Sequence, residues 1–124
     1  MSRLNHFMAK TRPLRLLQFF VAIIIFCYAA LTPSPQQILG QHADSYMHFL
    51  GNFLLYLSAW LALWRRISIF KLLLCLIPFS AAVEVAQYFS PPRTVDPHDF
   101  LANLAGLAAA ALVCAFFQWV LRRI

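Results

Sequence analysis

Charged side chains are scarce in this sequence, and their scarcity excludes an ordinary soluble domain. Only 11% of the 124 residues are Asp, Glu, Lys or Arg, whereas 62% are hydrophobic. A soluble domain carries roughly 25% charged residues because its surface must face water. This chain has too few charges to cover such a surface, so most of its surface must face lipid. The length suits one domain, which we take to be residues 1–124.

Acidic residues and cysteine motifs are also sparse. The four Asp and Glu residues are outnumbered by ten Lys and Arg, giving a net charge of +6. Basic chains often bind nucleic acid, but these basic residues form clusters that flank apolar runs, so we expect no nucleic-acid partner. The cysteines lie inside apolar runs without CxxC or Cys/His spacing, which excludes zinc-finger and thioredoxin motifs. We interpret Cys27, Cys75 and Cys114 as packing residues and expect no metal and no cofactor.

Long apolar runs are what the sequence does contain. A membrane-spanning helix needs about 20 mostly apolar residues, and four such runs occur, each bounded by prolines or arginines. The first could instead be a signal peptide, but its apolar stretch exceeds the usual length of about 7–15 residues; we therefore favour a retained helix. The sequence predicts an all-α fold, a four-helix transmembrane bundle with helices at about 14–31, 46–64, 69–88 and 100–121.

The distribution of basic residues predicts the orientation of this bundle. Lys and Arg are enriched in cytoplasmic loops close to the ends of spans. With four spans, the N-terminus, the middle loop and the C-terminus share one side, and every Lys and Arg except Arg93 falls there. Asp44, Asp96 and Asp99 fall on the other side. The sequence therefore predicts that both termini are cytoplasmic.

Polar residues on the second predicted helix form a stripe. Asp44, His48, Asn52 and Tyr56 follow one another at steps of four, which places them along one side of a helix from its outer end inward. A capping Asp followed by side chains that bond to neighbouring helices would also give this pattern. We take Asp44 and Asn52 as candidate ligand-binding residues and His48 as a candidate acid or base.

The third predicted helix carries Glu84 and Gln87 near its outer end. An ionisable side chain within a span is costly and usually faces the bundle interior or a wet cavity. A buried ion pair of Glu84 with His48 or Arg93 is the structural alternative. We take Glu84 as the strongest single candidate for function and Gln87 as a candidate ligand-binding residue.

Arg93 lies in the second outer loop, directly after Pro91 and Pro92. Arginine suits bidentate binding of carboxylate or phosphate, and the prolines restrict the loop that carries it. Anchoring to lipid headgroups is an equally good interpretation of an arginine at this position. We take Arg93 as a candidate ligand-binding residue.

The last predicted helix begins with a polar residue and continues with small ones. Asp99 is expected to cap it, and Asn103 follows on the same face as a further candidate for ligand binding. Ala102, Gly106 and Ala110 place small residues at intervals of four, which permits close helix approach. Polar groups of three helices thus share the outer third, where burial is costly unless they bond to each other or to a ligand.

The ordered set of these residues resembles the VanZ-like family, named after a protein associated with teicoplanin resistance. Ala110 departs from the pattern, since family members often have a second glycine there. The resemblance implies a place in the bacterial cell envelope, as a multi-pass protein of the cytoplasmic (inner) membrane. The matching motifs are Asp44-x-x-x-His48 with Gly51, Asn52 and Tyr56, then Glu84-x-x-Gln87-x-Phe89-x-Pro91-x-Arg93, then Asp99-x-x-x-Asn103-x-x-Gly106.

The sequence is compatible with three functions. The favoured one is binding of an anionic or lipid-linked envelope molecule in the outer leaflet, with Arg93 at its anionic group. The second is an intramembrane hydrolase or transferase that uses Glu84 with His48 or Asp99 as acid and base. These three side chains could also hold a metal, but their spacing in the sequence matches no recognised metal-binding motif. The third is a non-catalytic scaffold or accessory subunit that acts through an envelope-protein partner or a homo-oligomer.

Overall fold

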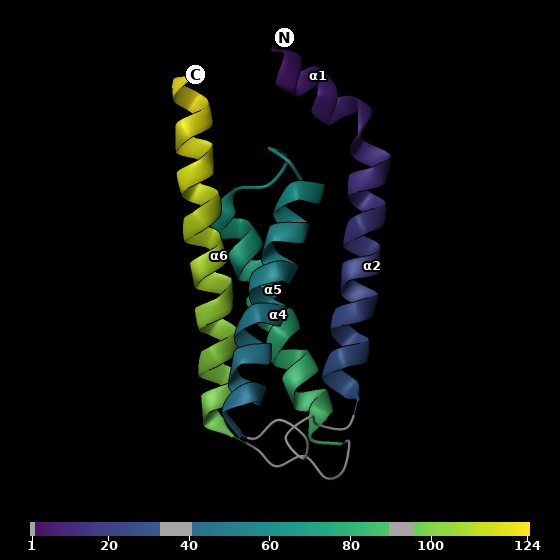
Figure 1. Ribbon diagram of the computed structural model, residues 1–124, viewed down its shortest axis with the longest axis vertical. Helices are drawn as coiled ribbons and strands as arrows, with labels where there is room; N and C mark the ends of the chain where they lie inside the picture. The colour runs from purple at the N-terminus through teal and green to yellow at the C-terminus, as the bar shows by residue number, and fades with distance from the viewer. Residues whose placement is uncertain (1, 33–40, 90–95) are drawn as a thin grey trace.

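A computed structural model describes residues 2–32, 41–89 and 96–124 of the chain, and the fold is all-α throughout these residues. A short N-terminal helix precedes four long ones (Figure 1). The helices are α1 (Arg3–Lys10), α2 (Arg12–Leu31), α4 (Gln41–Ala62), α5 (Ile69–Gln87) and α6 (Pro97–Arg123).

Local sequence signals explain where several helices begin. Pro13 lies in the first turn of α2, where its missing N–H is not needed. Ser68 caps α5, since its side chain accepts a hydrogen bond from the backbone N–H of Lys71 at 3.2 Å. Asp96 caps α6 by accepting from the backbone N–H of His98 at 2.9 Å. This hydrogen bond, and a second from the His98 ring, lower the pKa of Asp96 below its usual value.

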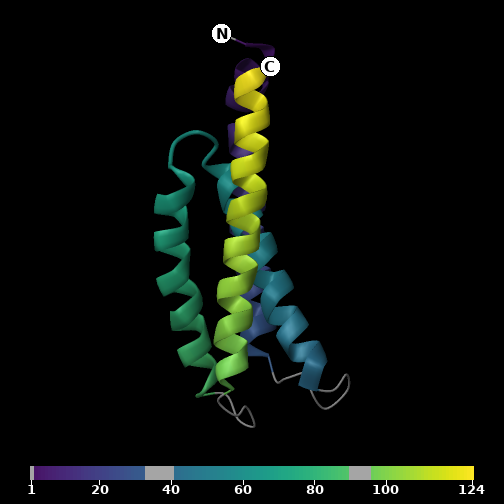
Figure 2. The ribbon, with the colours of Figure 1, turned by 90° about the vertical axis from the view of Figure 1, so that its left-hand side faces the viewer.

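Helix α4 occupies the centre of the bundle. It contacts α2, α5 and α6, while α2 and α6 lie on opposite sides of the molecule (Figure 1). The turned view shows α5 and α4 on either side of α6 (Figure 2). The core between these helices is apolar in the half nearer the termini and includes Leu55, Tyr56, Ala59, Leu72, Leu107, Ala110 and Cys114.

The outward faces of the helices are apolar. Side chains such as Phe20, Ile24 and Leu112 are more than 60% exposed, an arrangement that water would disfavour and lipid tails would not. Three of the described helices, α2, α5 and α6, are long and apolar enough to cross a membrane. Helix α4 is not among them because polar residues such as His48 and Asn52 lower its mean hydropathy.

A close approach of α4 and α6 fixes the position of the polar residues that the two helices carry. At Gly106 a Cβ atom would collide with the backbone carbonyl oxygen of Phe49 and would lie 3.2 Å from the Cβ of Asn52. Only glycine allows the two backbones to come this close. The small-residue pattern of the last helix is therefore confirmed as a packing feature within the chain, with Gly106 and Ala110 both buried.

Arg15 and Gln18 connect α2 to α4 at the end of the bundle that carries the termini. The Arg15 guanidinium donates to the carbonyl oxygens of Leu61 and Ala62 at the end of α4. Gln18 and Ser58 exchange hydrogen bonds between α2 and α4, at 2.6 and 2.9 Å. Because these bonds satisfy polar groups inside an apolar bundle, they hold α2 against α4 at the end where both chain termini lie (Figure 1).

Several sequence predictions need adjustment. Helix α4 begins at Gln41, five residues before the predicted start at Tyr46, and α1 was not predicted at all. The last helix begins at Pro97, so Asp99 lies within its first turn and Asp96 is the cap. The expectation that Asp99 caps the helix was wrong. Cys75 is exposed on the outer face of the bundle and does not pack in the core.

Candidate functional site

Asn52 on α4 joins three helices at the end of the bundle opposite the termini. Its side-chain N–H₂ donates to the backbone carbonyl of His48, at 2.8 Å, and to Oδ1 of Asn103 on α6, at 2.7 Å. Its Oδ1 accepts from the Ser80 hydroxyl on α5, at 2.7 Å. Asn52 is only 1% exposed, so all of these bonds replace water that burial removed.

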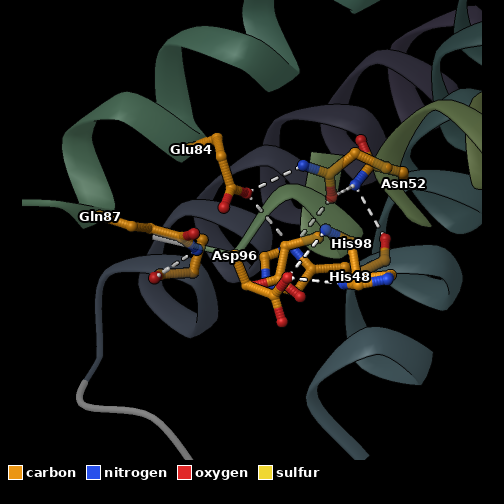
Figure 3. Close-up of polar contacts among 9 residues, drawn as sticks. His48, Asn52, Glu84, Gln87, Asp96 and His98 are labelled. Atoms are coloured by element: carbon orange, nitrogen blue, oxygen red, sulfur yellow. Dashed lines mark hydrogen bonds and ion pairs between the residues drawn. The ribbon is translucent and has the colours of Figure 1, made fainter. Parts of the chain in front are cut away.

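Asn103 connects this hydrogen-bond network to the carboxylate of Glu84. Its side-chain N–H₂ donates to Oε2 of Glu84 at 2.9 Å, and its Oδ1 lies 2.9 Å from Nδ1 of His48 (Figure 3). His48 Nδ1 is also 3.4 Å from Glu84 Oε2. The expected proximity of Glu84 to His48 is therefore confirmed, with Asn103 bonded to both.

The chain of amides fixes the tautomer of His48. The His48 carbonyl can only accept, so it orients the Asn52 amide group with its N–H₂ toward Asn103. Asn103 Oδ1 must then accept, and a hydrogen bond to it requires that His48 Nδ1 carry the hydrogen. Nε2 is consequently the nitrogen that can accept a proton or a metal ion when the ring is neutral.

Asp99 lies on the other side of the same imidazole. Its Oδ2 is 3.7 Å from His48 Nε2, and the residue is only 5% exposed. One ligand atom from each of His48, Glu84 and Asp99 can be chosen so that all three atoms lie within 4.8 Å of one another. The three residues come from α4, α5 and α6, so tertiary packing alone assembles them.

A cavity of about 390 Å³ adjoins this cluster. Small residues of two helices line it, namely Ala22 and Ala29 of α2 and Gly51 of α4. Leu50 and Leu54 also line it and are 54% and 53% exposed, which places its opening on the surface of the bundle. The wall is apolar except at the polar cluster, where His48, Asn52, Ser80, Glu84, Gln87 and Asn103 contribute to the lining.

Gln87 closes the far end of the cavity. Its side-chain N–H₂ donates to the backbone carbonyl of Ala30 at 2.8 Å, which ties the end of α5 to the end of α2 (Figure 3). Gln87 is 4% exposed and lines the cavity.

The described lining of the cavity is acidic. Glu84 belongs to the lining and Asp99 lies behind His48, whereas no Lys or Arg from the described ranges lines the cavity. Arg93 and the side chain of Asp44 lie outside the described residues. The described part of the site therefore offers mostly oxygen acceptors and one imidazole.

The structure thus brings together five of the sequence candidates, and Gln87 lies nearby. Tyr56, the fourth member of the α4 stripe, lies apart in the core, where its hydroxyl donates to the Ile69 carbonyl at 2.8 Å. Ser80 was missed by sequence reasoning, although it precedes Glu84 by four residues and so shares its helical face. His98 is exposed and lies in the first turn of α6 beside Asp96.

These features define the class of protein to which the chain belongs. The apolar helices and the buried polar cluster beside a cavity are those of a small helical membrane protein with an internal polar site. The family model VanZ/LLP1 matches residues 5–118, and the chain belongs to that family. The predicted VanZ-like membership is confirmed. No curated protein and no solved structure matches the chain.

Proposed function

We propose that this protein binds an amphipathic membrane molecule, with an apolar chain in the cavity and a polar head group against the cluster. One observation carries the proposal: a single cavity has apolar walls from α2 and α4 and a polar end built from α4, α5 and α6. A purely structural polar network would not need an adjoining cavity. A lipid or lipid-linked envelope molecule has this division into apolar and polar parts.

The membrane setting of the site follows from the basic residues. We infer that all four long helices cross the cytoplasmic membrane of a bacterium, with α4 partly covered by α2, α5 and α6. Arg3, Lys10 and Arg123 lie at the end of the bundle that carries the termini, and the enrichment of basic residues on the cytoplasmic side supports both termini being inside. The polar cluster would then face the outer leaflet.

In this proposal, polar side chains at the end of the cavity and in the outer loop recognise the head group. Glu84 and Gln87 present acceptor oxygens, which suit hydroxyl or amine groups of a ligand. An anionic group would need a compensating positive charge, and Arg93 is the proposed source in the outer loop. Asp44, Asn52 and Asn103 complete the set of residues proposed for binding.

A cavity-filling pair of variants tests the proposal. Ala29→Phe places a ring in the cavity, whereas Ala108→Phe makes the same change on an exposed position of α6 that does not line it. The purified protein in detergent is incubated with phosphatidylglycerol, phosphatidylethanolamine or a polyprenyl phosphate, and bound lipid is measured by native mass spectrometry. We expect Ala29→Phe to reduce the bound lipid at least tenfold and Ala108→Phe to leave it unchanged.

Two results would contradict lipid binding in the cavity. One is an equal amount of bound lipid in Ala29→Phe and the unchanged protein. The other is a loss of the same size in Ala108→Phe, which would indicate a general effect on folding or on the lipid annulus. Circular dichroism and size-exclusion profiles of both variants separate unfolding from loss of the site.

A second candidate function is acid–base catalysis on a lipid-linked molecule. It is favoured by the distances of 3.4 Å from His48 Nδ1 to Glu84 and 3.7 Å from His48 Nε2 to Asp99, which are close to the reach that proton transfer needs. Glu84→Gln keeps the shape of the side chain but removes its basicity. Catalysis would be contradicted if Glu84→Gln replaced the unchanged protein in cells without loss of function and the purified protein converted no candidate lipid.

A further inference from the structure

We propose that His48, Glu84 and Asp99 bind a divalent first-row transition-metal ion at the polar end of the cavity. The three side chains come from three helices, and one ligand atom from each lies within 4.8 Å of the others. Glu84 and Asp99 are buried, with side chains 4% and 8% exposed, and the side chain of His48 is 9% exposed. This site is distinct from an exposed cluster of acidic groups, which water would screen.

The orientation of the imidazole suits a metal ligand. Asn103 fixes the hydrogen on Nδ1, so Nε2 can coordinate an ion and points toward the Asp99 carboxylate at 3.7 Å. Histidine ligands almost always donate their other ring N–H to an oxygen acceptor, which holds the ring in position. Asn103 also donates to Glu84 Oε2 at 2.9 Å, so one amide side chain positions two of the three proposed ligands.

The spacing between the ligand atoms fits a coordinated ion. Nitrogen and oxygen ligands lie about 2.0–2.2 Å from Zn²⁺ in tetrahedral sites. Two such ligands on one ion are then separated by about 3.4 Å in tetrahedral geometry. The observed 3.7 Å between Nε2 and Oδ2 is too long for a hydrogen bond and close to this value. The three ligand atoms lie within 4.8 Å of one another, and Glu84 Oε2 lies 3.4 Å from Nδ1, so the Glu84 carboxylate has to move toward Nε2 when an ion binds.

A divalent ion also suits the charge of the cluster. Two carboxylates in a low-dielectric interior repel each other, and a cation between them lowers that repulsion. A divalent ion would neutralise both. The buried hydroxyl of Tyr88 has no hydrogen-bond partner among the described residues and interacts electrostatically with Glu84 and Asp99; water on a bound ion would give it one.

The ligand set narrows the choice of metal. Ca²⁺ takes six to eight oxygen ligands and Mg²⁺ retains several waters, whereas imidazole with carboxylates suits Zn²⁺ or Mn²⁺. Three protein ligands leave at least one coordination position. Since His48 and Glu84 line the cavity, a ligand inside the cavity could reach the bound ion.

The ion would change the kind of molecule that the cavity can hold. Without it the described lining is acidic, but with a divalent ion the site can accept a phosphate or carboxylate of a lipid head group. This part of the inference rests on the proposed function, while metal binding itself does not. The predicted anionic ligand and the acidic lining are then compatible.

Metal binding is tested on the full chain in lipid nanodiscs after removal of metals with a chelator. Zn²⁺ or Mn²⁺ is added, unbound ion is removed, and the metal content is measured by inductively coupled plasma mass spectrometry. We expect one ion per chain, and at least tenfold weaker binding for each of the near-isosteric variants His48→Asn, Glu84→Gln and Asp99→Asn. Asp96→Asn is the matched control because it alters the exposed carboxylate next to His98, at the same end of α6.

X-ray absorption by the Zn²⁺-loaded unchanged protein gives a test that needs no variant. We expect a first coordination shell of nitrogen and oxygen with one imidazole. Absence of stoichiometric metal, a sulfur ligand, or a loss in Asp96→Asn equal to that in Glu84→Gln would overturn the proposed site.

The lipid assay with phosphatidylglycerol separates the two proposals. Retention of the lipid only in the presence of metal supports both. Stoichiometric metal with no lipid in the cavity would leave the metal site standing and remove the proposed function. Lipid retention that is unaffected by chelator or by Glu84→Gln would remove the role of the ion in head-group binding.

Discussion

At the scale of single residues, Asn103 has the most consequential position in the polar cluster. It accepts from Asn52, contacts His48 Nδ1 and donates to Glu84, all within 2.9 Å. It is 4% exposed, so water cannot take over these roles. The side chain therefore sets the tautomer of His48 as well as the position of the Glu84 carboxylate.

We expect Asn103→Ala to lower the free energy of unfolding by about 1–3 kcal/mol, because it leaves buried polar partners without hydrogen bonds. Unfolding by sodium dodecyl sulfate in mixed micelles measures this change. Asn5→Ala is the control: Asn5 lies in α1 outside the bundle, with one long contact of 3.4 Å to Arg65, and its effect should stay within about 0.5 kcal/mol. Equal losses of unfolding free energy in both variants would show that Asn103 contributes no more to stability than Asn5 does.

At the scale of secondary-structure elements, the approach of α4 to α6 determines whether the cluster can form. Asn52 and Asn103 can bond at 2.7 Å only because Gly106 lets the helix backbones come close. Gly51, also on α4, faces α2, where an added Cβ would meet the Phe26 ring at 3.5 Å, an ordinary contact. The two glycines therefore offer a matched comparison.

We expect Gly106→Ala to destabilise the protein by about 1–3 kcal/mol, since overpacking forces the helices apart. Gly51→Ala should be neutral or stabilising by about 0.5–1 kcal/mol, because alanine favours the helix and nothing collides with it. The same micelle unfolding assay measures both. A destabilisation by Gly51→Ala as large as that by Gly106→Ala would contradict the importance of the α4–α6 contact.

At the scale of the whole molecule, the bundle has two unlike ends. The termini and the turn between α4 and α5 share one end (Figure 1), where the arginines of the described residues lie, and the polar cluster is near the other. The positive-inside tendency is the basis for our proposal that the first end is cytoplasmic. Lipid and metal would then reach the site from outside the cell or from the outer leaflet.

Cysteine labelling in whole cells tests this orientation. In a background without Cys27, Cys75 and Cys114, we expect His98→Cys to react with a membrane-impermeant maleimide in intact cells. Ser2→Cys and Ile124→Cys should react only after the membrane is permeabilised. The opposite pattern would reverse the orientation, and labelling of only one of the two terminal positions would contradict an even number of spans.

Much of the helical fold could be predicted from the sequence because apolar runs and their boundaries are local features. The helix at 69–88 matches α5 within one residue. The predictions failed where capping chemistry was ambiguous: two aspartates precede the last helix, and Asp96 proved to be the cap. The helix α1 lacks an apolar run and so gave no signal in a search for spans.

The sequence by itself determined that this is a helical membrane protein of the VanZ/LLP1 family, because hydropathy and motif spacing are properties of the chain alone. Spacing also placed His48, Asn52, Glu84, Asp99 and Asn103 toward one end. Only the tertiary structure decided that these side chains bond to one another, and that three of them converge within 4.8 Å beside a cavity. Contacts between residues about 20 to 50 positions apart depend on how α4, α5 and α6 pack, and Gly106 permits the closest of those packings.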